Sequence, residues 1–124
     1  MTTAYKIPRS VLVVIHTPYL QVLMMERAGW KDFWQSVTGS VASESEPLRD
    51  TAIREVREET GLDPARHALV DWGIENRFEI FKRHQSRYAP GVTHNTEHVF
   101  SLCVPEGVPV KTTSPGSSVM PWVT

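Results

Sequence analysis

The chain has 124 residues, of which 40% are apolar, and this length and composition suit one globular domain spanning residues 1–124. The 13 basic and 14 acidic residues give a net charge of −1. This balance argues against a nucleic-acid partner or attachment to a membrane surface, because both need an excess of basic residues. The single cysteine, Cys103, excludes an internal disulfide framework, and no apolar stretch is long enough to span a bilayer, so a cytoplasmic location is expected.

The first half of the chain predicts short strands followed by one helix. The β-branched run Ser10–Thr17 predicts a buried strand, and Gln21–Ala28 predicts a second strand that forms a hairpin with it. The stretch "WQSVTG", residues 34–39, is also typical of a strand. From Glu46 to Gly61 the pattern predicts a helix, with a proline in a position that a first turn tolerates and a glycine at the C-cap. Ser43 and Glu46 have the spacing of a capping box.

The second half predicts further strands and a polar tail. Residues 67–84 indicate one or two strands, residues 87–96 a loop, and residues 97–104 another strand. The tail begins at Val108 as a short strand and then fills with Ser, Pro, Gly and Thr, with no helical pattern after Val110. Strands on both sides of a single helix indicate a mixed-sheet α/β or α+β domain.

Three glutamates within "REVREETGL", residues 54–62, raise the question of a metal site. On a helical wheel Glu55, Glu58 and Glu59 overlap the edge of the apolar stripe instead of lying on the outer face. Like charges at these spacings repel one another, and partial burial increases that cost. Arg54, four residues before Glu58, can offset part of the cost, and a hard divalent cation would offset more. A solvated charged face is the alternative.

At these residues the sequence resembles the Nudix hydrolases, whose signature is completed by Gly39, Glu46 and "REVREETGL". The resemblance implies an α/β/α sandwich that uses Mg²⁺ or Mn²⁺ to cleave a nucleoside diphosphate linked to another group. It implies that Arg54 orients the glutamates and that Glu46 steadies the loop before the helix. Glu58 or a neighbouring group would take the proton from water. The implied catalytic residues are Arg54, Glu55, Glu58 and Glu59, and the implied metal ligands are Gly39, Glu55, Glu58 and Glu59.

Four further segments, "YKIPRSVLVVI", "FWQSVTGSV", "RFEIF" and "RYAPGVTHNTEHVF", resemble one Nudix branch, the dihydroneopterin triphosphate pyrophosphatases of bacterial folate synthesis. That resemblance implies a small-molecule substrate, dihydroneopterin triphosphate or a related (deoxy)nucleoside triphosphate such as dATP, converted to the monophosphate and pyrophosphate. Strand alternation allows at most one pair of the "FEIF" side chains to face the ligand directly. Glu97 has two interpretations, a solvated turn residue or a contact of the metal centre. The implied substrate-binding residues are Lys6, Arg27, Thr38, Phe78, Glu79, Ile80 and Phe81.

The sequence departs from the family pattern in three places. Six residues instead of five separate Gly39 from Glu46, which could shift the Gly39 carbonyl but not the helix ligands. Gly116 stands where the branch has a glutamate that adds to the metal site. The C-terminal helix of the family has no counterpart after Val110, so one sheet face is expected to be uncovered. The consequence would be self-association, such as a homodimer, or a truncated chain with weak activity. A weakly active or inactive nucleotide-binding module is therefore the alternative to a Mg²⁺-dependent pyrophosphohydrolase.

Overall fold

The computed structural model describes residues 5–26, 34–110 and 118–123, the last of these ranges as backbone only. No helix in these residues is long and apolar enough to cross a membrane. In chain order the elements are β1 (Arg9–His16), β2 (Val22–Glu26), β3 (Trp34–Gln35), β4 (Val37–Ser40), α1 (Leu48–Thr60), the 3₁₀ helix η1 (Pro64–Arg66), β5 (Ala68–Glu79), the 3₁₀ helix η2 (Lys82–Arg87), β6 (His94–Cys103) and β7 (Ser118–Val123).

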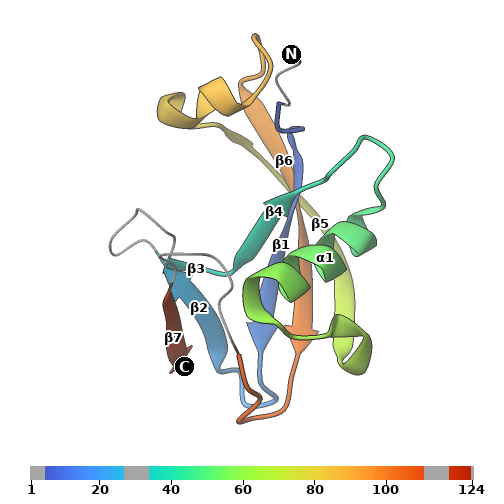
Figure 1. Ribbon diagram of the computed structural model, residues 1–124, viewed down its shortest axis with the longest axis vertical. Helices are drawn as coiled ribbons and strands as arrows, with labels where there is room; N and C mark the ends of the chain where they lie inside the picture. The colour runs from blue at the N-terminus through green and yellow to red at the C-terminus, as the bar shows by residue number, and fades with distance from the viewer. Residues whose placement is uncertain (1–4, 27–33, 111–117, 124) are drawn as a thin grey trace.

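The strands form one mixed sheet with the order β3-β2-β1-β6-β5 (Figure 1). β1 runs parallel to β6, from Arg9 opposite Thr96 to His16 opposite Cys103. The other side of β1 is shared, because β2 pairs with its C-terminal end and β4 with its N-terminal end, both antiparallel. β5 pairs antiparallel with β6, and β7 pairs antiparallel with β2. The predicted mixed sheet and the hairpin between β1 and β2 are confirmed.

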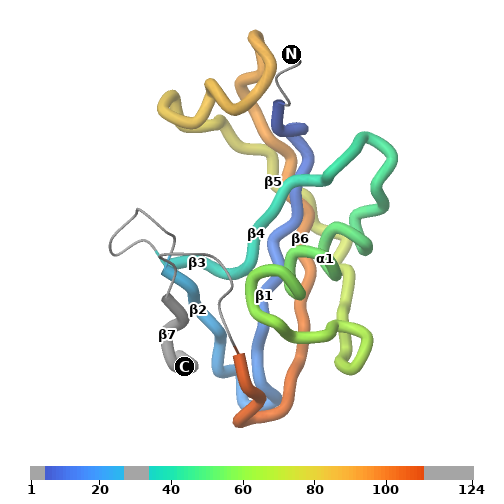
Figure 2. Tube along the Cα trace, in the orientation of Figure 1, coloured from blue at the N-terminus to red at the C-terminus, as the bar shows by residue number. Residues whose placement is uncertain are grey.

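α1 begins after Pro47, two residues later than the predicted start at Glu46, and ends before Gly61, which is the C-cap as predicted. Gly61 adopts a φ of 73°, the left-handed conformation that glycine reaches most easily at the end of a helix. The predicted capping box is wrong, because Pro47 is the N-cap and no side chain caps the helix there. The Glu46 carboxylate instead accepts a hydrogen bond from the Ala42 N–H at 2.9 Å. This contact closes the loop that extends away from β4 before it returns to α1 (Figure 2).

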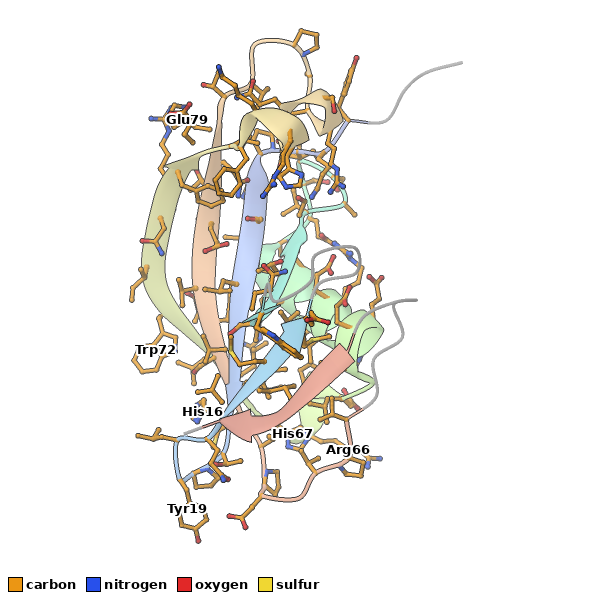
Figure 3. The ribbon with its side chains drawn as sticks, turned by 90° about the vertical axis from the view of Figure 1, so that its left-hand side faces the viewer. His16, Tyr19, Arg66, His67, Trp72 and Glu79 are labelled. Carbon is orange, nitrogen blue, oxygen red and sulfur yellow. The ribbon has the colours of Figure 1, made fainter. Side chains whose placement is uncertain are left out.

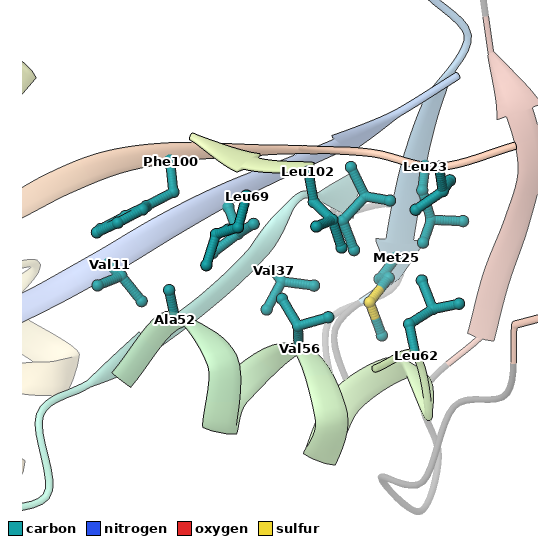
Figure 4. Close-up of a cluster of buried hydrophobic side chains, with 13 residues drawn as sticks. Val11, Leu23, Met25, Val37, Ala52, Val56, Leu62, Leu69, Phe100 and Leu102 are labelled. Carbon is teal, nitrogen blue, oxygen red and sulfur yellow. The ribbon is translucent and has the colours of Figure 1, made fainter. Parts of the chain in front are cut away.

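The core lies between α1 and the sheet (Figure 4). Ala52 and Val56 of α1 are completely buried, while Leu48 and Ile53 are partly buried and pack against the same cluster. The predicted apolar stripe is therefore the face that α1 turns toward the sheet. The central strands contribute Val11, Val13, Ile15, Phe100 and Leu102.

The sheet face away from this core exposes apolar side chains along β5. Val70, Trp72 and Ile74 are 42%, 57% and 49% exposed, and Trp72 lies at the outer side of the sheet (Figure 3). Within the described ranges, α1 is the only α-helix, and it packs on the opposite face. An exposed apolar face was expected from the sequence, and self-association through it stays a prediction.

The C-terminal part of the sheet differs from the sequence-based expectation. Residues 67–84 hold one strand, β5, with an irregularity between Asp71 and Ile74, and then η2. Residues 108–110 are not a strand, so that prediction is wrong. The sequence analysis missed β7, which lies along β2 although it contains Pro121. Gly116 lies outside the described residues.

Candidate active site

Arg54 of α1 is the centre of a cluster of carboxylates. Its guanidinium donates to both oxygens of Glu46, at 2.9 and 3.2 Å, and to Glu55 Oε1 at 2.8 Å. It also donates to the backbone carbonyl of Ser40 on β4 at 3.0 Å. One turn further along α1, a carboxylate oxygen of Glu58 lies 3.7 Å from the same guanidinium. These are the contacts that an orienting role for Arg54 requires.

Glu46 ties the loop to the beginning of the helix. Its carboxylate accepts hydrogen bonds from the Ala42 N–H at 2.9 Å and from the Thr51 hydroxyl at 2.7 Å, in addition to those from Arg54. The hydrogen bond from Arg54 is the main cause that lowers the pKa of Glu46 to about 2, against the opposing effect of burial. Glu46 is therefore charged throughout the physiological pH range and holds the loop against α1.

Glu55 is buried and packs directly against Gly39 of β4. A Cβ atom at Gly39 would overlap the carboxyl carbon of Glu55, so this approach of β4 to α1 requires glycine. Burial raises the pKa of Glu55, the Arg54 guanidinium opposes that shift, and the charge of Glu58 adds to it. The extra residue in the preceding loop has therefore not separated Gly39 from the helix.

Glu58 and Glu59 differ in their exposure. The Glu58 side chain is 57% exposed, whereas Glu59 is partly buried and lines a cleft. In the part of the chain that the structure describes, no three Asp, Glu, His or Cys side chains form a preassembled metal site. The three glutamates share α1, but the Glu55 carboxylate is engaged by Arg54.

A cleft of about 550 Å³ lies beside Glu59. Its volume is within the range of small-molecule sites. It is bounded by β4, by the adjoining ends of β5 and β6, and by η2. The lining residues thus come from both ends of the strand order, Gln35 of β3 and Phe78 of β5, and α1 contributes Glu59.

Most of the residues predicted to bind substrate line this cleft, namely Lys6, Thr38, Phe78, Ile80 and Phe81. Glu79 does not line it, because its side chain is exposed on the outer side of β5 (Figure 3). Phe81 lines the cleft together with Phe78 and Ile80, contrary to strict alternation, because β5 ends at Glu79 and the chain then enters η2. Arg27 lies outside the described residues.

The cleft carries both cationic and anionic side chains. Lys6 and Arg87 are neighbours, since the Lys6 N–H donates to the Arg87 carbonyl at 2.8 Å. The Lys6 ammonium lies 5.9 Å from the centre of the Tyr88 ring, within cation–π range. Glu59 and Glu97 contribute carboxylates, and burial raises the pKa of Glu97. Cations, aromatic rings and carboxylates in one cleft suit a flat anionic ligand accompanied by a metal ion.

A family model described as the NUDIX domain matches residues 6–124, which include the carboxylate cluster and the cleft. The chain belongs to the Nudix family. This Nudix chain is 48% identical over 104 residues to a dihydroneopterin triphosphate diphosphatase of Escherichia coli, covering 82% of the chain and 69% of that relative. A protein of the same name from Haemophilus influenzae is 48% identical over 102 residues, covering 80% and 63%.

Solved structures show the same fold. The structure of the E. coli dihydroneopterin triphosphate pyrophosphohydrolase matches with a TM-score of 0.87 and 42% identity, covering 98% of this chain and 83% of that one. A Listeria monocytogenes protein assigned as a NUDIX hydrolase matches with a TM-score of 0.73 and 22% identity, covering 95% and 78%. The mixed sheet with one main helix is thus a Nudix fold.

Nudix hydrolases generally use divalent cations, and the donors on this chain suit such an ion. Glu55, Glu58 and Glu59 offer carboxylate oxygens, and Gly39 offers a backbone carbonyl. Oxygen donors of this kind are the ligands of hard cations such as Mg²⁺ and Mn²⁺. Because Gly39 has no side chain, the Glu55 carboxyl fits directly beside β4. The residues present therefore fit the metal that the family uses.

Sequence reasoning missed several polar residues of the cleft. Their local sequence carries little signal, since Ser10 adjoins a run of apolar strand residues and Asn95 falls in a stretch with the composition of a loop. The available signal is the segment "RYAPGVTHNTEHVF", within which the sequence indicates only Glu97 as a candidate. The missed lining residues include Ser10, Gln35, His84, Arg87, Tyr88 and Asn95.

Proposed function

We propose that this Nudix hydrolase converts dihydroneopterin triphosphate, or a related (deoxy)nucleoside triphosphate such as dATP, to the monophosphate and pyrophosphate in the presence of Mg²⁺. The observation that carries the proposal is a cleft with cations and aromatic rings that is lined by Glu59 of α1 and by Gly39, against which the Arg54-bound Glu55 packs. The 48% identity to proteins named for dihydroneopterin triphosphate supports the choice of substrate. The family match over residues 6–124 supports a single Nudix domain.

In the proposed reaction, water adds across the anhydride bond between the α- and β-phosphorus atoms, and pyrophosphate leaves. Lys6 and Arg87 offer positive charge to the phosphate oxygens. Phe78 offers a ring face to the flat heterocycle. A divalent cation would neutralise phosphate charge and acidify water.

The helix supplies the remaining groups for this reaction. Arg54 positions the carboxylates, as its contacts with Glu46 and Glu55 indicate. Glu55, Glu58 and Glu59 would hold the cation, and Glu58 or Glu59 would take the proton from the attacking water. Gly39 would add its backbone carbonyl oxygen to the ligand set.

The test is a pyrophosphate-release panel with Mg²⁺ and Mn²⁺, using dihydroneopterin triphosphate and the common ribo- and deoxyribonucleoside triphosphates. We expect turnover in the ordinary enzymatic range, on the order of 1–1000 s⁻¹, for at least one substrate. The double variant Glu58→Gln/Glu59→Gln should lower kcat by about a thousandfold, because both carboxylates lose their charge and neither can accept a proton. The matched control is Glu44→Gln/Glu106→Gln, which removes two exposed carboxylates away from the cleft. Activity that survives the Glu58/Glu59 double substitution would overturn the assigned roles.

A nucleotide-binding module with little or no catalysis is the second candidate. It is favoured by the ion pair between Arg54 and Glu55, and by the lack of a preassembled three-ligand metal site in the described residues. Titration calorimetry separates the two functions. Tight binding of a triphosphate together with background turnover across the whole panel would support the binding module, and ordinary turnover would exclude it.

A further inference from the structure

One residue of the cleft wall, Asn95, carries a buried polar atom without a partner. Asn95 of β6 is only 4% exposed and lines the cleft, yet its Oδ1 atom has no hydrogen-bond partner. Among the residues described, it is the only buried side-chain nitrogen or oxygen in this condition. Buried acceptors in folded proteins are normally paired, so an unpaired one at a ligand cleft points to a partner carried by the ligand.

The Asn95 amide is held in place by the neighbouring strand. Its Nδ2 donates to the Ser10 hydroxyl on β1 at 2.8 Å. Ser10 is itself buried and lies opposite Glu97 in the parallel β1–β6 pairing. Asn95 and Glu97 are two residues apart on β6, so their side chains leave the same face of the sheet. The strand register and the hydrogen bond together fix the amide, and Oδ1 is the atom left for the ligand.

An aromatic ring lies next to this acceptor. Phe78 of β5 is directly opposite Asn95 in the β5–β6 pairing, and directly opposed residues project to the same face. Phe78 is 43% exposed and lines the cleft together with Ile80 and Tyr88. A fixed hydrogen-bond acceptor beside a partly exposed ring matches a flat heterocycle that carries N–H donors on its edge.

We propose that Asn95 Oδ1 accepts a hydrogen bond from an amino group on the heterocycle of the substrate, and that Ser10 is the residue that positions the Asn95 amide. This inference rests on the proposed function and refines its substrate class. The preferred triphosphates carry an amino-substituted ring, as aminopurines and pterins do. A triphosphate whose ring lacks the amino group leaves Oδ1 buried and unpaired, which is the condition under which a site rejects an analogue most strongly.

The experiment compares two substrates that differ only in this group, dATP and purine 2′-deoxyriboside triphosphate. Wild-type protein should favour dATP in kcat/KM by about 10- to 100-fold. Asn95→Leu, which keeps most of the volume without the amide, should bring that ratio to about one. Ser10→Ala frees the amide to rotate and should lower the ratio by roughly three- to tenfold, mainly through KM. Asn76→Leu is the matched control, because Asn76 is exposed on the adjacent strand outside the cleft, and its ratio should equal that of the wild type.

A wild-type ratio near one, or an Asn95→Leu protein that keeps the wild-type ratio, would overturn the proposal. Calorimetry on the wild-type protein with dAMP and purine 2′-deoxyriboside monophosphate supplies a second measurement that needs no variant. A tenfold or greater preference for dAMP supports the inference even if no triphosphate is turned over. Equal affinity overturns it even if the pyrophosphohydrolase activity is found. Failure of the inference and failure of the proposed function are thus distinguished.

Discussion

At Gly39 of β4 the Glu55 carboxyl of α1 occupies the space that a side chain would fill. We expect Gly39→Ala to push Glu55 away, lower kcat by at least about tenfold, and reduce the free energy of unfolding by about 1–3 kcal/mol. Urea unfolding and the pyrophosphate assay measure the two effects.

A double-mutant cycle tests whether the cause of that loss is the overlap with Glu55. In a Glu55→Ala background the side chain that blocks the new methyl group is absent, so the stability cost of Gly39→Ala should largely disappear. If the stability costs of Gly39→Ala and Glu55→Ala simply add in the double variant, the cost of Gly39→Ala does not come from overlap with Glu55.

Because of Glu46, the free energy of unfolding should vary with pH in the acidic range. Its pKa in the folded chain is about 2, below its ordinary value of 4.5, so its charged form stabilises the fold above pH 4.5. As the pH falls from 4.5 towards 2, protonation in the unfolded chain removes this contribution. We expect Glu46→Gln to cost about 1–3 kcal/mol at pH 7 in urea unfolding, and the difference from wild type to shrink through this window.

The comparison variant for this pH dependence is Glu44→Gln in the same loop, where the carboxylate is exposed. Its effect on the free energy of unfolding should be within about 0.5 kcal/mol at every pH. A Glu46→Gln deficit that stayed constant down to pH 2 would contradict the assigned ion pair with Arg54.

At this scale the sequence predicts contacts made within the helix better than contacts made across the fold. Arg54, Glu55 and Glu58 are positioned by helical spacing, and their predicted proximity is present in the structure. Glu79 is the counterexample. Its place on the outer side of β5 depends on where the strand ends, and that is decided by its pairing with β6.

α1 is the element that the sequence predicts most fully, because its apolar stripe, Pro47 and Gly61 are all local signals. Val56 is completely buried against the sheet. We expect Val56→Ala to reduce the free energy of unfolding by roughly 1–3 kcal/mol, because the lost methyl groups leave a cavity that the sheet cannot fill. Chemical denaturation measures the change.

Arg57→Ala, one position further along the helix, is the control for this packing effect. Arg57 is exposed and pairs with Asp63, also on the surface, so its removal should cost no more than about 1 kcal/mol. Equal losses at the two positions would mean that α1 does not pack on the sheet through the face described.

Strands were predicted less well than the helix, and β7 shows why. Residues 118–123 contain a proline and follow a run of Ser, Thr, Pro and Gly, which conceals the strand preference of their two valines and one tryptophan. Their extended conformation comes from pairing with β2, nearly 100 residues earlier in the chain. A single sequence carries no local signal for such a pairing.

On the scale of the whole molecule, the cleft is assembled from segments that are distant in the chain. Lys6 precedes the first strand, Thr38 lies on β4, and Phe78 lies near the end of β5. Segments of this chain that resemble a known family indicate these residues individually. Their proximity follows only from the order of the strands in the sheet. Asn95 was missed because its role depends on this assembly, through Ser10 on one side and Phe78 on the other.

Metal binding should appear as a change in the stability of the whole fold. The helix brings Glu55, Glu58 and Glu59 close to one another, and burial raises the pKa of Glu55, so a cation that relieves their repulsion binds the folded chain preferentially. At ten times the dissociation constant the gain is about 1.4 kcal/mol, which corresponds to a rise in Tm of roughly 3–6 °C for a chain of this size. Calorimetric melting with Mg²⁺ and Mn²⁺ at millimolar concentrations measures this rise in Tm.

The rise should be lost in Glu58→Gln/Glu59→Gln and kept in Glu44→Gln/Glu106→Gln. A wild-type Tm that neither ion changes would leave the glutamates as a charged helix face, and the metal-dependent mechanism would fail with it.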